Sequence, residues 1–559
     1  MSHLMHEETA REQRAFALEL KRVEDDARKK AIRDREQFKG LQIAPTASFE
    51  DDAEGREPGD QNWTGYGFDL HPHVTFLSTF VLVSFILLTL MFKEDASEFF
   101  KSAMEVITTT TGWFLILVTN VFVLAAFYFA LGRFGKIRIG GLDAKPEFST
   151  PAWFAMLLSA GMGIGLMFWS VGEPIFHYAS PSPMFTGVQA QTPEAAQAAM
   201  GVTYFHWGMH PWAVYAIVGL GLAFFAYNRG LPLTMRSVFY PLLGNKIYGF
   251  WGNLIDVLSV LATLVGLATS LGLGVKQINA GLNSLFGVGI STTTQVTLIA
   301  VITAVATLSV MSGLDKGVKR LSQANMVLAA VFVLFLLLVG PTIFILSGFT
   351  QNLGYYLTIF PELSLWTETF RESNWQGSWT VFYWAWWISW SPFVGMFIAR
   401  VSYGRTVREF ITWVLVVPTV IGLIWMGTFG GAALDQLFTE GYRGVADAVP
   451  ELALFKMLEG LPFTNIVSTV SVFLIAIFFI TSADSGALVM DIITAGGKLD
   501  APVVQRVFWC VLAGMVAIAL MLGGGMASLQ SLTISIGLPF GFVLLLMCIG
   551  LLRGLREEQ

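Results

Sequence analysis

The residues best suited to chemistry in this sequence are tryptophans, four of which lie in the segment YWAWWISWSP at positions 383–392. Trp386, Trp387 and Trp390 are spaced i, i+1 and i+4, which groups them on one side of a helix. They lie in the middle of an apolar run, whereas membrane tryptophans usually gather near its ends. Indole faces without a nearby carboxylate attract a quaternary ammonium group or a similar soft cation. The pattern predicts a site for such a cation, with a dry tryptophan core as the alternative.

A second candidate site is the glycine-rich stretch Gly161-Met162-Gly163-Ile164-Gly165. Glycine at every second position does not line one helix face, whereas helix-packing motifs space small residues by four. Three glycines in five positions weaken a helix and let a ligand approach the bare backbone. We therefore expect an unwound segment whose N–H groups and carbonyls bind something polar. Tight helix packing is the alternative.

A pair of hydroxyls, Thr481 and Ser482, lies in the apolar segment FFITSADSG, and Gly486 follows closely. Hydroxyls together with freed carbonyls provide the oxygen ligands that hard cations require. The pair therefore suggests a site for a monovalent cation. The alternative is that both hydroxyls bond back to their own helix.

Two other chemistries fit the sequence less well. His206 and His210 form an i, i+4 pair that could hold a metal, but no acidic third ligand stands beside them in the sequence. A channel would need a continuous polar stripe or a ring of charges, and no such stripe is seen. We therefore expect neither an enzyme nor a channel.

Composition places these segments in a membrane. The 559 residues are 54% hydrophobic and 13% charged, whereas soluble proteins are nearer a quarter charged. The two cysteines, Cys510 and Cys548, lie in apolar runs and form neither a disulfide framework nor a metal spacing. We expect a lipid bilayer as partner and no nucleic acid.

Twelve apolar stretches are long enough to cross a bilayer as helices. Fifteen lysines and arginines fall in the loops that would face the cytoplasm if the N-terminus does, and six in the opposite loops. This asymmetry predicts a multi-pass protein of the cell inner (plasma) membrane with both termini cytoplasmic. The predicted spans are 73–92, 112–131, 153–171, 202–227, 254–273, 292–312, 325–347, 379–398, 409–434, 466–488, 507–522 and 531–552.

The spans divide into two sets of five preceded by two extra helices. The glycine-rich span opens the first set and the tryptophan-rich span opens the second. An odd number of helices per set inverts the second set relative to the first, as in transporters with a midplane site between broken helices. The predicted segments are a cytoplasmic charged helix and linker at 1–71, two peripheral helices at 72–134, repeat 1 at 148–350, an extracellular amphipathic connection at 351–377, repeat 2 at 378–553 and a short cytoplasmic tail at 554–559.

With these segments in order, the sequence resembles the betaine/choline/carnitine transporter family across residues 70–553. The most specific match is WAWWISWSPFVGMFIARVSYGRT. The stretches AGMGIGLMF, FHWGMHPWAVY, LSQANMVLA and FFITSADS also resemble family blocks and occur in the same order. The resemblance implies an all-α integral membrane protein with two inverted five-helix repeats, the LeuT-type fold, and a homotrimer.

The resemblance also assigns roles to residues. Trp386, Trp387 and Trp390 would hold the trimethylammonium group, and the stretch Gly161, Met162, Gly163 and Gly165 would meet the substrate carboxylate. The matching aromatics of the fourth span, which would complete an aromatic box, are Trp207, Trp212 and Tyr215. The sodium ligands would be the hydroxyls of Thr481 and Ser482 with the carbonyls of Ser159, Met162 and Phe478.

A second sodium site of the family would involve Thr263 and Phe393. The sequence departs from the pattern there, because the next hydroxyl position, four residues after Thr263, is Leu267. Only the site at Thr481 and Ser482 keeps its expected hydroxyls. Sodium, as the coupling ion, is the only cofactor we expect.

Position 165 separates the substrate branches of the family. Proton-coupled choline carriers resemble G-x-G-x-D in this stretch, and this chain has Gly165 in place of the aspartate. A zwitterion has no net charge, so its site needs no buried acidic partner. We therefore expect sodium-coupled symport of glycine betaine or a similar zwitterion (dimethylsulfoniopropionate, ectoine or proline) by alternating access. Proton-coupled choline uptake and sodium-independent carnitine-type exchange are the alternatives.

Overall fold

The computed structural model describes residues 57–161, 163–311, 315–370, 373–439 and 441–558, and most of these residues are helical. Two short strands, β1 (Trp63–Gly65) and β2 (Phe68–Leu70), pair as an antiparallel hairpin before the first helix. The helices are α2 (Pro72–Met91), α3 (Lys93–Leu131), α4 (Thr150–Gly161), α5 (Ile164–Ala179), α6 (Pro193–Trp207), α7 (Met209–Tyr227), α8 (Tyr240–Leu243), α9 (Phe250–Phe286), α10 (Thr292–Met311), α11 (Asp315–Val339), α12 (Thr342–Leu365), α13 (Phe382–Val401), α14 (Val407–Phe438), α15 (Pro450–Glu459), α16 (Thr464–Thr494), α17 (Val503–Leu522) and α18 (Met526–Glu557). Short 3-10 or π turns occur at η1 (Arg133–Lys136), η2 (Met235–Phe239), η3 (Gly244–Tyr248) and η4 (Gly377–Val381).

Most of these helices are suited to a bilayer. Within the described residues, ten helical segments are long and apolar enough to cross a membrane, and the bent pair α4–α5 makes an eleventh. The predicted span at 379–398 coincides with α13, which is not among the eleven. Its tryptophans and Tyr383 carry polar N–H and O–H groups, which lower its hydropathy. The count of twelve spans and the inverted repeats stay predictions.

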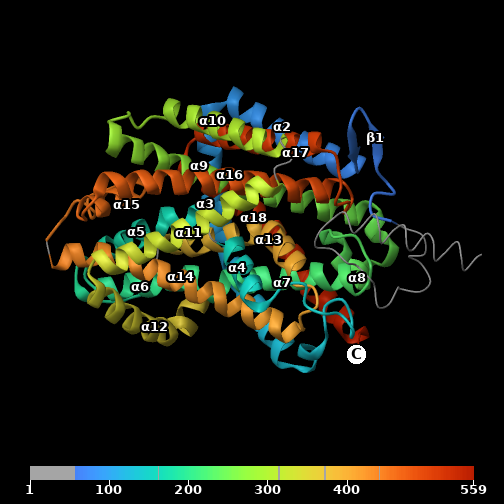
Figure 1. Ribbon diagram of the computed structural model, residues 1–559, viewed down its shortest axis with the longest axis horizontal. Helices are drawn as coiled ribbons and strands as arrows, with labels where there is room; N and C mark the ends of the chain where they lie inside the picture. The colour runs from blue at the N-terminus through green and yellow to red at the C-terminus, as the bar shows by residue number, and fades with distance from the viewer. Residues whose placement is uncertain (1–56, 162, 312–314, 371–372, 440, 559) are drawn as a thin grey trace, which may run out of the picture.

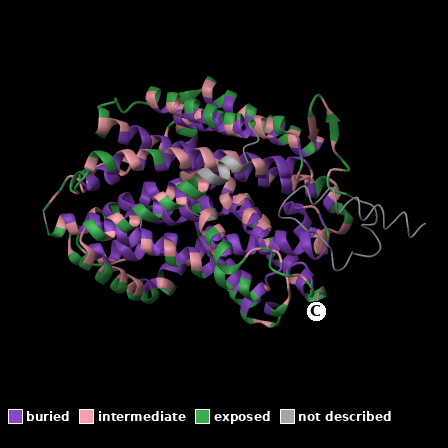
Figure 2. Cartoon of the chain, in the orientation of Figure 1, coloured by how far each residue is buried: buried purple, intermediate pink, exposed green. Residues whose placement is uncertain are grey.

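Several long helices, among them α9, α14 and α16, run along the length of the molecule (Figure 1). The β1–β2 hairpin, α8 and the C-terminus lie at one end of the molecule, and α15 lies at the other (Figure 1). Helix α13 is buried along most of its length and packs against α7, α9 and α18. Buried residues fill the interior of this bundle, and exposed residues gather at its surface (Figure 2). The tryptophan-rich segment therefore lies in the protein interior.

The glycine-rich span is interrupted, as its composition predicts. The helix axis turns by 67° between residues 150–159 and α5. Gly163 precedes α5 in an extended conformation, with φ −160° and ψ −169°. Residues on both sides of the break therefore expose backbone groups that a continuous helix would pair internally.

Two predicted boundaries were wrong. The third span, expected to end at residue 171, continues as α5 to Ala179, so Glu173 belongs to a buried helix and not to a loop. The seventh span, expected at 325–347, is α11, which ends at Val339 because Gly340 and Pro341 follow. The next helix, α12, occupies part of the predicted connection at 351–377.

The N-terminal prediction is tested only in part. The predicted charged helix falls within residues 1–56, which lie outside the described residues. Residues 57–62, at the end of the expected linker, form a turn closed by the Asn62 N–H donating to the Gly59 carbonyl at 2.8 Å. The Asn62 side chain donates to Asp69 and to the carbonyl of Ala495, after α16. These bonds fasten the hairpin to the helical bundle.

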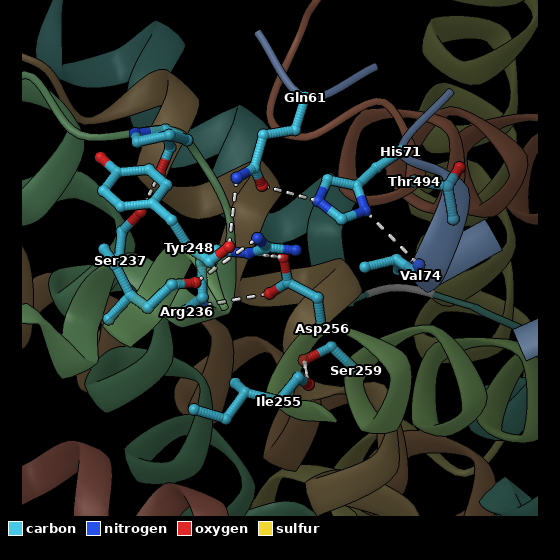
Figure 3. A network of polar contacts seen from close by, with 12 residues as sticks. Gln61, His71, Val74, Arg236, Ser237, Tyr248, Ile255, Asp256, Ser259 and Thr494 are labelled. Atoms are coloured by element: carbon cyan, nitrogen blue, oxygen red, sulfur yellow. Dashed lines mark hydrogen bonds and ion pairs between the residues drawn. The ribbon is translucent and has the colours of Figure 1, made fainter. Parts of the chain in front are cut away.

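A polar network beneath the hairpin joins it to three further elements (Figure 3). His71 Nε2 lies 3.1 Å from Gln61 Oε1, and Gln61 donates to the Tyr248 carbonyl at 3.2 Å. Arg236, on η2, donates through its backbone N–H and Nε to the two carboxylate oxygens of Asp256, on α9, at 3.1 and 2.5 Å. Burial, with a smaller contribution from the Arg236 charge, lowers the pKa of His71 to about 4. His71 is therefore neutral at neutral pH.

Candidate functional site

A cavity of about 150 Å³ lies beside the break between α4 and α5. Helices α7, α9, α11, α13, α14 and α16 and the end of α6 complete its wall. All six aromatic residues predicted for the substrate line this one cavity, namely Trp207, Trp212, Tyr215, Trp386, Trp387 and Trp390. The predicted aromatic, glycine and hydroxyl residues thus meet in one place, although they come from α5, α6, α7, α13 and α16.

Three of the tryptophans form a compact cluster. The rings of Trp386 and Trp387 are stacked, with centroids 4.9 Å apart and planes inclined by 13°. Trp207 stands nearly perpendicular to both, with centroids 5.0 Å from Trp387 and 6.4 Å from Trp386. All three residues line the cavity. Indole ring faces grouped in this way can attract a methylated ammonium group.

The remaining predicted aromatics form two edge-to-face pairs elsewhere on the wall. The ring centroids of Trp212 and Tyr215 are 5.4 Å apart, and those of Trp390 and Phe393 are 5.1 Å apart. Trp390 also packs closely on Gly266 of α9, where an added Cβ would lie 2.5 Å from Cδ1 of the indole. Trp390 is therefore held at a distance from the stacked pair by its own contacts.

The indole N–H groups differ in how they are held. Trp207 Nε1 donates to the Glu173 carboxylate at 2.8 Å, and Trp387 Nε1 donates to the His206 carbonyl at 3.2 Å. Trp386 Nε1 and Trp390 Nε1 are buried and find no acceptor among the described residues. Hydrogen bonds thus fix the indoles of Trp207 and Trp387, whereas packing alone fixes those of Trp386 and Trp390.

The glycines on the cavity wall have distinct roles. A Cβ at position 165 would lie 2.8 Å from Trp386 Cη2 and 2.9 Å from Trp207 Cη2, so only glycine fits between these rings. A Cβ at position 163 would meet no described atom within 4 Å. Both residues line the cavity. The structure does not describe Met162 or the surroundings of Gly161, so the predictions for these two residues lie outside it.

The described wall carries hydroxyls but no carboxylate and no cationic side chain. None of the described lining residues is Asp, Glu, Lys or Arg. Six serine and threonine hydroxyls face or border the cavity, including those of Ser270 and Ser485. A buried site without a fixed charge suits a ligand whose own charges cancel.

Four of the five predicted sodium ligands line this same cavity, namely Ser159, Phe478, Thr481 and Ser482. The Thr481 hydroxyl donates to the Ile477 carbonyl at 2.9 Å, a back-bond to its own helix that leaves its lone pairs available. Ser159 Oγ lies 3.4 Å from Ser322 Oγ. The hydroxyls therefore lie within reach of the helix break, and their role as ion ligands stays a prediction.

The proposed second ion site is divided. Phe393 lines the cavity, but Thr263 does not. Thr263 is buried on α9, and its hydroxyl has no hydrogen-bond partner among the described residues. Leu267, one turn further along α9, packs its side chain against Gly486 on α16. An apolar contact thus stands where a second hydroxyl would be needed.

A buried acidic residue beside the cavity was missed. The expectation that no acid stands beside His206 was wrong, because His206 Nδ1 lies 2.6 Å from Glu173 Oε1. Tyr383 O–H donates to Glu173 Oε2 at 2.5 Å, and His177 Nε2 lies 3.7 Å from Oε1. An ionisable residue inside a membrane helix is in itself a signal of function, and it was overlooked because residue 173 was assigned to a loop.

The two histidines considered as a metal pair point to different partners. His210 Nε2 lies 3.3 Å from both Asn120 Oδ1 and Ser364 Oγ, whereas His206 Nε2 lies 3.0 Å from Thr380 Oγ1. The His206–His210 pair therefore does not converge on one ion. The group whose atoms do converge is Glu173, His177 and His206, and all three residues are buried.

Comparison with known proteins agrees with this geometry. Residues 73–559 match the model of the BCCT, betaine/carnitine/choline family transporter. A glycine betaine/proline/choline transporter of Vibrio parahaemolyticus is 48% identical over 507 residues, which cover 88% of this chain and 91% of the relative. Glycine betaine transporter 1 of the same organism is 48% identical, covering 90% and 97%. The glycine betaine transporter OpuD of Bacillus subtilis is 45% identical, covering 82% and 89%.

One solved structure, that of a manganese transporter mutant of Eremococcus coleocola, is 11% identical to this chain. The match covers 72% of this chain and 81% of the solved chain, and its TM-score of 0.39 supports no inference. These three relatives are named as transporters. The aromatic cavity, the apolar helices and the match over nearly the whole membrane region lead to one conclusion: this chain is a multi-pass membrane transporter, not an enzyme, and belongs to the betaine/carnitine/choline transporter family.

Proposed function

We propose that the chain is a sodium-coupled symporter that takes up glycine betaine or a similar zwitterionic compatible solute by alternating access. The observation that carries the proposal is the aromatic cavity beside the break between α4 and α5, whose described wall holds six aromatic residues of the predicted set and no charged side chain. Such a wall attracts a methylated ammonium group while leaving its neutralising carboxylate to backbone donors.

In this proposal each part of the cavity has a task. Trp386, Trp387 and Trp207 surround the trimethylammonium group, and Trp390, Trp212 and Tyr215 close the remaining sides. The backbone of the glycine stretch donates to the carboxylate, which no side chain on the described wall is charged to meet. Losing one desolvated cation–π contact costs about 2 kcal/mol, so several such contacts would dominate the affinity.

Sodium is proposed to bind at the same break. The ligands would be the hydroxyls of Thr481 and Ser482 with carbonyls of Ser159, Met162 and Phe478. Hard cations take about five or six oxygens, so these five ligands would nearly complete the coordination. Because the ion and the substrate share the broken helix, binding of one would order the segment that the other needs.

The first alternative is uptake of choline, which has the same ammonium group without a carboxylate. One relative carries choline, proline and glycine betaine together in its name. The second alternative is exchange of a carnitine-like substrate without an ion. Proton-coupled uptake would respond to pH and ignore sodium, and an exchanger would run counterflow in the absence of any ion gradient.

The deciding experiment is uptake by proteoliposomes containing the purified chain. Glycine betaine, dimethylsulfoniopropionate, ectoine, proline, choline and carnitine would each be offered with an inward sodium gradient, with an inward proton gradient and with neither. We expect uptake of glycine betaine or another zwitterion only with sodium. Choline uptake driven by protons alone, or counterflow without ions, would replace the proposal by the matching alternative.

We further propose that both termini face the cytoplasm of the cell inner (plasma) membrane. The two native cysteines are buried, so a cysteine introduced at an exposed position can be labelled selectively. Lys145→Cys, between α3 and α4, and Gln189→Cys, between α5 and α6, are both exposed. In intact cells a membrane-impermeant maleimide should label position 189 but not position 145.

We also propose a homotrimer, which rests on the family resemblance. Native mass spectrometry of the detergent-purified chain tests it directly. A mass of three chains is expected, and a single-chain mass that persists across several mild detergents would argue against it.

A further inference from the structure

We propose that Glu173 is a positioning residue of the aromatic site, which orients Trp207 for the substrate without touching the substrate itself. The inference rests on the proposed function, because it concerns how that site recognises its ligand. Glu173 is completely buried on α5 but does not line the cavity. It lies behind Trp207, and Trp207 does line the cavity.

The contacts of Glu173 are directional and come from two other helices, α6 and α13. One carboxylate oxygen, Oε2, accepts the Trp207 indole N–H at 2.8 Å and the Tyr383 O–H at 2.5 Å. The other oxygen, Oε1, lies 2.6 Å from His206 Nδ1. An ionised carboxylate only accepts hydrogen bonds and has about four lone-pair sites. One side chain of α5 therefore fixes donors on α6 and on α13 at the same time.

The histidine that completes the cluster is itself held in place. His206 Nε2 lies 3.0 Å from Thr380 Oγ1, and its ring stacks on Tyr383 with centroids 4.6 Å apart. The His206 carbonyl accepts the N–H of Trp387, the second tryptophan of the stacked pair. The carboxylate thus fixes Trp207 directly and is connected to Trp387 through His206.

The ring of Trp207 is closely surrounded by its neighbours. Its ring stands at 72° to Trp387 and at 84° to Trp386, and its outer edge meets Gly165. The indole N–H of Trp207 donates to Glu173 at 2.8 Å, and we infer that this bond selects the orientation in which the ring fits the cavity.

A metal ion is the competing interpretation of the same residues. Ligand atoms of Glu173, His177 and His206 lie within 4.8 Å of one another, and neither His177 nitrogen has a hydrogen-bond partner among the described residues. Both Glu173 oxygens and both His206 nitrogens, however, already have partners within 3.0 Å. An ion bound by His206 would have to replace one of these contacts, because both ring nitrogens are already engaged, so the positioning role accounts for more of the geometry.

The test is a double-mutant cycle between Glu173→Gln and Trp207→Phe, with Tyr383→Phe as a second partner. Binding of glycine betaine to the detergent-purified chain is measured by calorimetry, and uptake is measured in proteoliposomes. The glutamine keeps the size of the side chain but offers one acceptor oxygen in place of two. Trp207→Phe keeps an aromatic ring and removes the N–H donor.

We expect Glu173→Gln to raise KM for glycine betaine at least tenfold, with a smaller change in kcat and an unchanged sodium dependence. In the background of Trp207→Phe, Glu173→Gln should cause less than a threefold further loss, because its donor is already absent. The red edge of the tryptophan emission should shift in Glu173→Gln before any substrate is added. The matched control is Glu368→Gln, which alters a buried glutamate that bonds Gln376 and no box tryptophan, and which should leave KM unchanged.

Three outcomes would overturn the proposal. The first is a KM for Glu173→Gln equal to that of the wild type, and the second is full additivity with Trp207→Phe. The third is zinc at one ion per chain that disappears in His177→Ala, which would make the cluster a metal site. If Glu173→Gln does not fold, the cycle between Trp207→Phe and Tyr383→Phe still applies, because both donors share Oε2 and their effects should not add.

The failure of this inference differs visibly from the failure of the proposed function. If the wild-type chain binds no glycine betaine, the proposed substrate is wrong, and the cycle is repeated with whichever solute the uptake experiment identifies. If the wild type binds glycine betaine and Glu173→Gln binds it equally well, the substrate is right and the positioning role is wrong.

Discussion

Gly165 lies directly against Trp386, so closely that a Cβ at position 165 would be 2.8 Å from Cη2 of the indole. The same Cβ would lie 2.9 Å from Cη2 of Trp207. Contacts shorter than 3 Å between carbon atoms are repulsive, so a side chain at this position must push at least one ring away. The broken helix and the tryptophan cluster therefore pack against each other at Gly165, where only glycine leaves room for both rings.

This contact predicts that Gly165→Ala weakens binding of glycine betaine at least tenfold. The added methyl group displaces Trp386 or Trp207 and opens the cluster before any ligand arrives. Calorimetry on the purified variant measures the loss, and the tryptophan emission of the empty protein reports the displaced rings. Wild-type affinity together with an unchanged emission spectrum would refute the prediction.

The matched control for Gly165→Ala is Gly163→Ala. A methyl group at position 163 meets no described atom within 4 Å, and the extended backbone there is open to any residue. The empty cluster should therefore be intact in this variant. A loss of affinity in Gly163→Ala without a change in the empty spectrum would indicate that the ligand itself approaches the backbone at this residue.

A second prediction concerns Trp390, which faces the cavity apart from the stacked pair. We expect Trp390→Leu to lower the affinity for a trimethylammonium substrate at least tenfold, because a desolvated cation–π contact is worth about 2 kcal/mol and 1.4 kcal/mol is a factor of ten. Proline, which lacks the methylated ammonium group, should lose less. Competition between labelled glycine betaine and unlabelled proline in proteoliposomes separates the two effects. Equal losses for both solutes would mean that Trp390 only packs.

A third prediction concerns pH and the network in Figure 3. Because burial lowers the pKa of His71 from 6.5 to about 4, the folded protein favours the neutral imidazole. This contribution to stability is complete above pH 6.5 and is lost as the pH falls from 6.5 towards 4. The melting temperature of the wild type should therefore fall between pH 7.5 and pH 5.

The control for this effect is His71→Asn, which still caps α2 but does not titrate. Its melting temperature should fall less over the same interval. A thiol-reactive dye reports the transition, because the two cysteines are buried in the folded protein. Parallel curves for the two proteins would show that His71 does not carry the pH dependence.

Much of the site could be predicted because its signals are local. The spacing of Trp386, Trp387 and Trp390 alone predicts that they share a helix side, and all three line the cavity. The alternating glycines predict a broken helix, and the axis turns by 67° there. Both predictions depend on the 3.6-residue period and on the weak helix propensity of glycine, which act over a few residues.

The support behind the site could not be predicted in the same way, because it depends on contacts between distant segments. Glu173 was assigned to a loop since a carboxylate normally ends an apolar run. Its donors, Trp207 and Tyr383, lie 34 and 210 residues away in sequence. Only the fold shows that these donors offset the cost of burying the charge. The predicted end of the seventh span was too late. Apolar residues continue past Pro341 into α12, so hydrophobicity alone does not mark the end of α11.

The last prediction concerns the ion. Thr481 and Ser482 line the cavity beside Ser159 and Phe478, whereas Thr263 lies away from it with Leu267 where a second hydroxyl would be needed. Sodium requires about five or six oxygens, as other hard cations do. We therefore expect Thr481→Ala with Ser482→Ala to raise the sodium concentration for half-maximal uptake more than tenfold, or to abolish uptake. Thr263→Ala should change it much less.

The sodium dependence of the initial uptake rate, measured at a fixed concentration of glycine betaine, decides between the two sites. Thr263 is a demanding comparison, because its buried hydroxyl has no partner among the described residues and would be available to an ion. A larger loss in Thr263→Ala than in the double variant would assign the coupling ion to α9. A Hill coefficient for sodium near two that persists without the two hydroxyls of α16 would likewise mean that sodium binds elsewhere. If these hydroxyls hold a coupling ion, their removal must abolish the contribution of that ion to transport.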